Sequence, residues 1–267
     1  MDASLDDRDD GVEYEPEDFR LGSFSFSVTT IAFMPIETLM ANQGKTVEIS
    51  GQKLWCGSLA VAEYLLGSGG SGGSGGGRLE AGVTVVELGA GTGVLGMLCK
   101  RLGAGRVLLT DNDARSLRHM RQDCARNNVE AEVVALDWFS PNVGALLPPP
   151  PGTAAAGTTV PPLLVVAGDV LYKQCLLEPF MATARAILAA QVEGAEAQML
   201  LCHVPRAGVQ HEDVQAAACA AGLATAAVER QLWLRGSCLE YCPAEDTDRA
   251  VVYRVTLASA VALQAEA

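Results

Sequence analysis

The sequence of 267 residues has no uninterrupted apolar run of the roughly 20 residues that a membrane-spanning helix requires. It does not begin with the charged and then apolar layout of a secretory signal. Its eight cysteines form no CxxC pair, and its three histidines have neither HExxH nor HxxxH spacing. We therefore expect a protein of the cytoplasm, with the nucleus as the alternative, that has reduced thiols, no metal site and no membrane partner.

Basic residues are outnumbered, with 19 Lys and Arg against 32 Asp and Glu, so the formal net charge is −13. Residues 2–20 alone hold nine of the acids, and we expect residues 1–22 to form an acidic, disordered tail. An acidic surface repels the phosphate backbone, which argues against nucleic acid as a partner and is compatible with a basic protein.

Hydrophobic residues make up 49% of the chain, enough for a substantial core. Alternating apolar residues predict short strands at 23–33 and 45–50, which together would form an N-terminal β element. Apolar residues at near-helical spacing predict a helix over 54–66, ended by Gly67. The stretch 67–77 contains only Gly and Ser, and we interpret it as a flexible insertion.

Strand and helix patterns alternate from residue 83 onward, which is typical of a parallel sheet with crossover helices. Strands are predicted at 83–88, 106–111, 131–136, 162–169, 198–204, 228–234 and 250–257, and helices from about 93, 113–127, 176–191 and 209–221. The Pro-rich stretch 148–162 is expected to be a surface insertion. We therefore predict one α/β domain over 23–267, with a Rossmann-like, seven-stranded, mostly parallel sheet and helices on both faces.

The strongest local motif is Glu87-Leu88-Gly89-Ala90-Gly91-Thr92-Gly93, in which an apolar strand enters a glycine turn that opens a helix. Such a turn lets a ligand approach bare backbone, and the N–H groups at the helix start attract a carboxylate or phosphate. Gly91, Gly93 and Gly96 also fit the GxGxxG pattern of dinucleotide-binding proteins. The ExGxGxG form, the glycine directly after the strand and the acids at later strand ends instead favour S-adenosylmethionine.

Acidic residues follow each of the next predicted strands. Asp111, with Asn112 beside it, ends the second strand, where a carboxylate could accept bonds from the hydroxyls of a ribose. The alternative for Asp111 is a helix N-cap, a role for which Asn112 and Asp113 compete. Asp137 and Trp138 follow the third strand and could hold an adenine, although a core Trp beside a turn Asp remains an equal alternative.

The segment Gly168-Asp169-Val170-Leu171-Tyr172 completes a resemblance to the class I methyltransferases, and in particular to methyltransferase family 16, the seven-β-strand protein-lysine methyltransferases. The order of the early strands, Trp55, the ExGxGxG loop and Asp-x-x-Tyr is similar to that family. Cys56 and Gly57 depart from its more usual Trp-Asp or Trp-Pro, and the Gly-Ser and Pro-rich insertions are not family features.

The resemblance implies a protein that binds S-adenosylmethionine and methylates a lysine-bearing protein, and we expect it to be a monomer. It implies a catalytic pair of Asp169 and Tyr172 and a cofactor site of Trp55, Glu87, Gly89, Gly91, Gly93, Asp111, Asp137 and Trp138, to which we add Asn112. Asp169 would draw in the lysine ammonium, and the Tyr172 ring would wall the channel and attract the cation. The alternatives are another acceptor, such as a protein arginine, a histidine or a small molecule, and a non-catalytic module that binds the cofactor.

Overall fold

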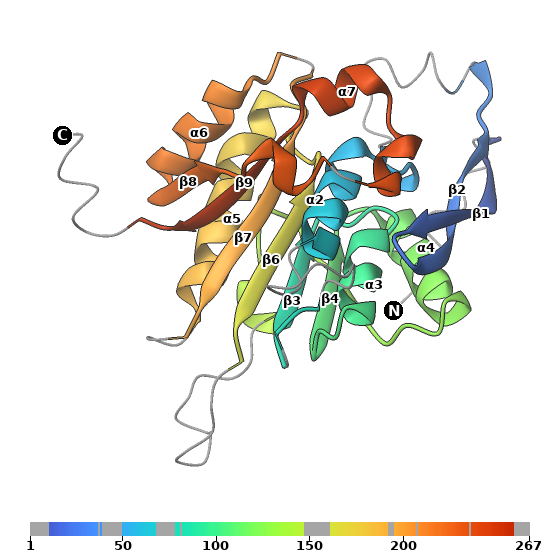
Figure 1. Cartoon of the computed structure of the whole chain (residues 1–267), viewed down its shortest axis with the longest axis horizontal. Coiled ribbons are helices and arrows are strands. Elements are labelled where there is room, and N and C mark those ends of the chain that lie inside the picture. Colours follow the sequence, from blue (N-terminus) through green and yellow to red (C-terminus); the bar gives the residue numbers. More distant parts are fainter. Residues whose placement is uncertain are drawn as a thin grey trace.

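The computed structural model describes residues 11–36, 38, 50–67, 78–80, 82–146, 161–191, 195–206, 208–234 and 236–258. Its centre is a seven-stranded sheet with the strand order β5-β4-β3-β6-β7-β9-β8 (Figure 1). Strand β9 runs antiparallel to the other six strands, which are parallel to one another. The strands are β3 (Thr84–Leu88), β4 (Arg106–Asp111), β5 (Glu132–Ala135), β6 (Leu163–Gly168), β7 (Ala197–His203), β8 (Leu223–Ala227) and β9 (Val251–Leu257). The predicted fold class is therefore confirmed.

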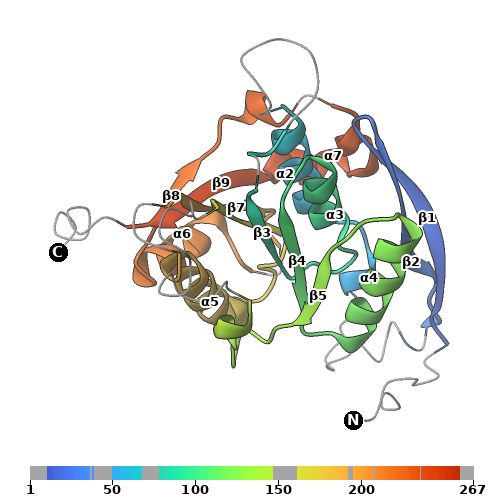
Figure 2. The ribbon, with the colours of Figure 1, turned by 90° about the horizontal axis from the view of Figure 1, so that it is seen from below.

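Helices cover both faces of this sheet (Figure 2). They are α2 (Cys56–Gly67), α3 (Val94–Arg101) and α4 (Ala114–Arg126) on one face, and α5 (Leu177–Ala189) and α6 (His211–Ala220) on the other. Successive residues of β3 enter separate cores: Val85 packs in the α2–α3–α4 core, whereas Val86 and Leu88 pack in the α5–α6 core. Burial on both faces explains why these strands are continuously apolar rather than alternating.

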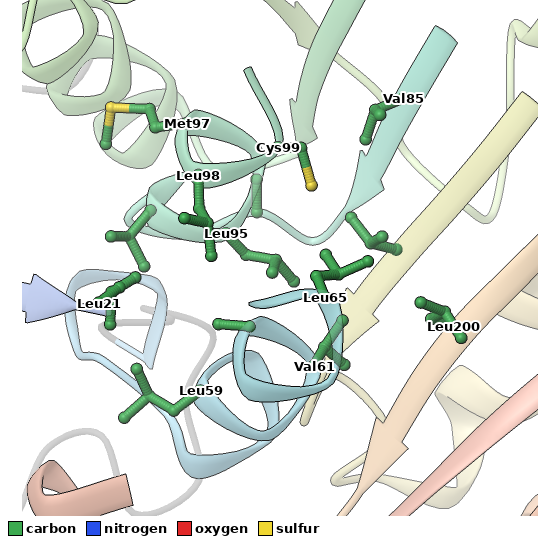
Figure 3. Close-up of a cluster of buried hydrophobic side chains, with 14 of the residues drawn as sticks. Leu21, Leu59, Val61, Leu65, Val85, Leu95, Met97, Leu98, Cys99 and Leu200 are labelled. Atoms are coloured by element: carbon green, nitrogen blue, oxygen red, sulfur yellow. The ribbon is translucent and has the colours of Figure 1, made fainter. Parts of the chain in front are cut away.

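The core between α2, α3 and the sheet is built from aliphatic side chains at helical spacing (Figure 3). Leu59 and Leu65 from α2 lie with Leu95 and Leu98 from α3, and all four are at most 5% exposed. Burying a leucine side chain contributes about 1.5–3 kcal/mol, so this interface contributes strongly to fixing α2 on the sheet.

The prediction of a disordered tail over residues 1–22 is wrong for its second half. Glu13–Leu21 form strand β1, which pairs antiparallel with β2 (Phe24–Phe33). Phe19 and Leu21 point into the core, and the acidic residues before them lie largely on the exposed side. A strand with one solvated face tolerates such charge, so acidity did not prevent folding. The first ten residues lie outside the described part of the chain.

The β1–β2 hairpin is attached to α4 by buried polar groups. The Asp123 carboxylate, whose residue is fully buried, accepts hydrogen bonds from the Thr29 backbone N–H and hydroxyl, both at 2.8 Å. The Asn127 side-chain amide accepts a hydrogen bond from the Ser27 N–H at 2.8 Å and donates one to the Ser27 carbonyl at 2.7 Å. These two bonds are the ones that a neighbouring strand would otherwise make with the Ser27 backbone. These contacts fix the hairpin beside α4.

One further expectation changes towards the C-terminus. The predicted strand at 228–234 is a 3₁₀ turn, η5 (Arg230–Leu232), and the strand is β8, which begins directly after Gly222. Gly222 has a φ of 73°, a left-handed conformation that turns the chain straight from α6 into β8. Residues 45–49 of the strand predicted over 45–50, the Gly-Ser residues 68–77 and most of the 148–162 insertion lie outside the described residues. Ser50, the last residue of that predicted strand, begins the 3₁₀ turn η1 (Ser50–Gln52). No described helix is both long and apolar enough to cross a membrane.

Candidate functional site

The glycine loop follows β3 and passes very close to neighbouring backbone. Gly89 and Gly91 have φ values of 65° and 53°, which side chains rarely adopt. A Cβ on Gly91 would lie 2.6 Å from the Gly51 carbonyl oxygen, and one on Gly89 would lie 2.9 Å from Val170 Cγ1. The loop therefore requires glycine both for its backbone conformation and for its close packing.

A cavity of about 460 Å³ opens beside this loop at the carboxyl ends of β3, β4 and β6. The strand order diverges between β3 and β6, which is where open α/β sheets bind ligands. Of the residues predicted for the site, those that line the cavity are Trp55, Gly89, Gly91, Asp111, Asn112, Asp137, Trp138, Asp169 and Tyr172.

Asp111 is held at the cavity wall by two backbone groups. Its carboxylate accepts a hydrogen bond from the Gly91 N–H at 2.9 Å and one from the Asp113 N–H at 3.0 Å. Burial raises the pKa of Asp111, and these two hydrogen bonds partly offset the effect. The N-cap of α4 is Asp113, which accepts from the Ser116 N–H at 2.7 Å, so Asp111 does not have that alternative role.

Glu87 and Gly93 are not among the residues that line the cavity. Glu87 is 2% exposed and lies behind the loop, where its carboxylate accepts a hydrogen bond from the Gly96 N–H at 2.8 Å. Burial raises the pKa of Glu87 to about 8. Of the four acids expected to converge, Asp111, Asp137 and Asp169 therefore meet at one cavity, and the fourth supports the loop from inside the protein.

Asp137 and Trp138 form the wall after β5. The Asp137 carboxylate accepts a hydrogen bond from the Phe139 N–H at 2.9 Å, which fixes the turn. The Trp138 ring lies edge-on to Phe180, with the ring centroids 5.0 Å apart, and Trp138 also lines the cavity. The indole therefore contributes both to the α5–α6 core and to the site.

Helix α2 touches the end of β6 at the other side of the cavity. A Cβ on Gly57 would lie 2.4 Å from the Asp169 backbone nitrogen, and one on Gly168 would lie 2.3 Å from the Ser58 nitrogen. This contact brings Trp55, just before α2, to the same cavity as Asp169 and Tyr172. Gly57, which departs from the family pattern, is thus a packing requirement.

Asp169 has a φ of 61°, in the left-handed region that side chains other than Gly, Asn and Asp rarely adopt. Burial raises the pKa of Asp169, although bonding to Arg206 opposes the shift. The Arg206 guanidinium binds both carboxylate oxygens of Asp169, reaches Asp246 at 3.1 Å, and lies 5.0 Å from the Trp55 ring centroid. A buried carboxylate that lines a cavity, with a raised pKa and a specific charged partner, is typical of a functional site.

Arg206 lines the cavity but is not among the residues that the sequence predicted for the site. Its position just after β7, at the same edge of the sheet as the acids, was the available signal. Its two acidic partners could not be identified, because Asp246 comes from α7 (Ala244–Arg249), forty residues further along the chain.

The fold is that of the class I S-adenosylmethionine-dependent methyltransferases. The chain is similar in structure to a putative methyltransferase complexed with S-adenosylhomocysteine (TM-score 0.53, 12% identity, covering 91% of this chain and 56% of that one). A putative S-adenosylmethionine-dependent methyltransferase from Streptococcus mutans has a TM-score of 0.50, 11% identity and the same coverage.

Residues 36–214 match the model of methyltransferase family 16, described as lysine methyltransferase, and the chain belongs to that family. Ribosomal protein L11 methyltransferases are similar over a shorter stretch. The protein from Thermosipho africanus is 42% identical over 62 residues, and that from Thermosipho melanesiensis is 41% identical over 59 residues. These matches cover 23% and 22% of this chain, and this chain spans only about a quarter of the length of those relatives (24% and 23%).

Proposed function

We propose that this methyltransferase is a protein-lysine N-methyltransferase. The observation that carries the proposal is a single cavity with two chemically different ends. One part of its lining is the glycine loop with Asp111 and Asp137, at the ends of β3, β4 and β5. The other part is Asp169 and Tyr172, after the end of β6, with Trp55 just before α2. The family description and the protein acceptor in the relatives' name support the same choice.

The first end suits S-adenosylmethionine, which supplies an electrophilic methyl group on a sulfonium. We assign Asp111 to the ribose hydroxyls, because each of its oxygens accepts one backbone N–H and retains a free lone pair. Asp137 and Trp138 are assigned to the adenine, and Gly89, Gly91 and Asn112 to the approach of the ligand along the loop. Glu87 and Gly93 support that loop from behind rather than contacting the ligand.

The second end suits a lysine side chain. An aliphatic stem can lie along the Trp55 and Tyr172 rings, which also attract a cation. The Arg206 guanidinium holds the Asp169 carboxylate in place, and Asp246 pairs with both Arg206 and Arg249, at 3.1 and 3.2 Å. Asp169 is therefore a fixed hydrogen-bond acceptor for the lysine ammonium. Asp169 then orients the amine for attack on the methyl carbon, and the proton of the amine leaves to water.

Transfer of a labelled methyl group to proteins of a cell lysate, followed by acid hydrolysis, tests the acceptor. We expect label in methyl-lysine. Label found only in methyl-arginine, methyl-histidine or small molecules would show that the acceptor is not lysine. Binding of S-adenosylhomocysteine without any transfer would show that the protein is a non-catalytic module that binds the cofactor.

The variant Asp169→Asn tests the acceptor end, since it removes the charge but keeps the shape. We expect transfer to fall by about tenfold or more, with affinity for S-adenosylhomocysteine changed by less than about threefold. Asp248→Asn is the matched control, because that side chain is 76% exposed and pairs with Arg230 outside the cavity. Equal transfer by Asp169→Asn and the control would remove Asp169 from the mechanism.

A further inference from the structure

Lysine is scarce in this chain and concentrated at the cavity. The sequence has four lysines, Lys45, Lys53, Lys100 and Lys173, against 15 arginines. Lys53 and Lys173 both line the cavity. Arginine would supply positive charge equally well, and most basic residues of this chain are arginines. The presence of two lysines at the proposed lysine-methylation site therefore suggests a role for the amine itself.

Both amines already lie over the aromatic rings that the proposed function assigns to an acceptor lysine. Lys173 Nζ is 5.2 Å from the centroid of the Tyr172 ring, and Lys53 Nζ is 5.1 Å from that of Trp55. The Lys173 residue is exposed, and its flexible four-carbon stem allows the amine to change position within the cavity.

Lys173 is the better placed of the two to accept a methyl group. It follows Tyr172 directly and lies on the same loop as Asp169, at the acceptor end. Lys53 shares the Trp55 ring with the Arg206 guanidinium, and it follows η1 (Ser50–Gln52), which packs against the glycine loop at the donor end.

We propose that Lys173 is a modification site, methylated by the active site of its own chain. This inference rests on the proposed lysine methyltransfer. The neutral Lys173 amine attacks the methyl carbon of S-adenosylmethionine, so that an N–C bond forms while the S–C bond breaks. The electron pair of the broken bond stays on sulfur, which yields S-adenosylhomocysteine, and the proton of the amine leaves to water.

The first experiment incubates the full chain with methyl-labelled S-adenosylmethionine and no other protein, followed by peptide mass spectrometry. We expect label on Lys173, with an observed rate that does not change on tenfold dilution of the protein, because the acceptor and the site are in one chain. Lys173→Arg keeps the charge and should abolish the label. Lys100→Arg is the matched control and should keep it, because the Lys100 ammonium binds the Gly105 carbonyl, just before β4 and at the opposite edge of the sheet.

A second readout does not depend on turnover. Brief acetylation of the intact protein with acetic anhydride, with and without S-adenosylhomocysteine, reports the accessibility of each lysine. We expect the bound product to lower acetylation of Lys173 several-fold and to leave that of Lys100 unchanged. Equal acetylation of Lys173 in both conditions would place its amine away from the donor and overturn the proposal.

The remaining outcomes separate this inference from the function on which it rests. Methyl-lysine in lysate proteins without label on Lys173 would overturn self-methylation and leave the proposed function standing. Label on Lys53, Lys45 or Lys100 in place of Lys173, or a rate that falls in proportion on dilution, would also overturn it. If no lysine is methylated in the lysate or in the chain itself, while S-adenosylhomocysteine still binds, both proposals fail together.

Discussion

The buried carboxyl of Glu87 predicts a specific dependence of stability on pH. Its pKa is about 8 in the folded chain, against an ordinary value of 4.5, mainly because of burial. The folded state therefore binds a proton that the unfolded chain releases between these two pH values, so stability falls as pH rises through this window. One pKa unit is worth about 1.36 kcal/mol, so the loss of stability between pH 5 and pH 8 is on the order of 3–4 kcal/mol.

The variant Glu87→Gln should escape this loss. Its amide has the shape of the protonated acid, and its carbonyl can still accept from the Gly96 N–H. We expect the free energy of unfolding of the variant, relative to the natural protein, to increase by about 3 kcal/mol from pH 5 to pH 8.

Urea denaturation at several pH values between 5 and 8 measures this difference directly. The control is Glu178→Gln, which removes one charge at an exposed position at the start of α5. Its stability difference from the natural protein should stay nearly constant over the same range. A constant difference for Glu87→Gln as well would refute the reasoning, since it would mean that the carboxyl ionises alike in the folded and unfolded states.

Three further predictions concern the cavity and its supports. Asp111→Asn should lower affinity for S-adenosylhomocysteine by about 10- to 100-fold in calorimetric titration, because hydrogen bonds to a charged acceptor contribute about 1.5–3 kcal/mol; unchanged affinity would remove the ribose role. Gly57→Ala should lower the free energy of unfolding by about 1–3 kcal/mol in urea, because the new Cβ meets the Asp169 backbone at 2.4 Å; a stabilised variant, as expected from helix propensity alone, would contradict this contact. Asp123→Ala should lower the free energy of unfolding by about 1–3 kcal/mol for each donor that it leaves unsatisfied. It should also speed hydrogen exchange at the Thr29 N–H, which loses its 2.8 Å partner; unchanged exchange would show that this hydrogen bond does not hold the hairpin.

Local sequence patterns were sufficient to predict the central sheet and much of the site. Strands that are buried on both faces have continuous apolar runs, as in Leu163–Gly168, which are easy to recognise in the sequence. The alternation of such runs with helices is compatible with few topologies. Parallel strands that share one carboxyl edge bring their terminal residues together. Asp111, Asp137 and Asp169 could therefore be assigned to one cavity from local sequence alone.

Contacts between segments far apart in the chain could not be predicted from local patterns. The acidic residues 13–21 become a strand because β2 pairs with them and Phe19 and Leu21 find a core. Glu87 points behind the loop because the Gly96 N–H is its partner there, and alternation along β3 did not reveal that. Arg206 binds Asp169 after β6 and Asp246 on α7, and Gly57 packs against the end of β6. A local pattern of apolar and polar residues predicts helices and strands. It does not show which distant residues a side chain will contact, because those contacts form only when the helices and strands pack together.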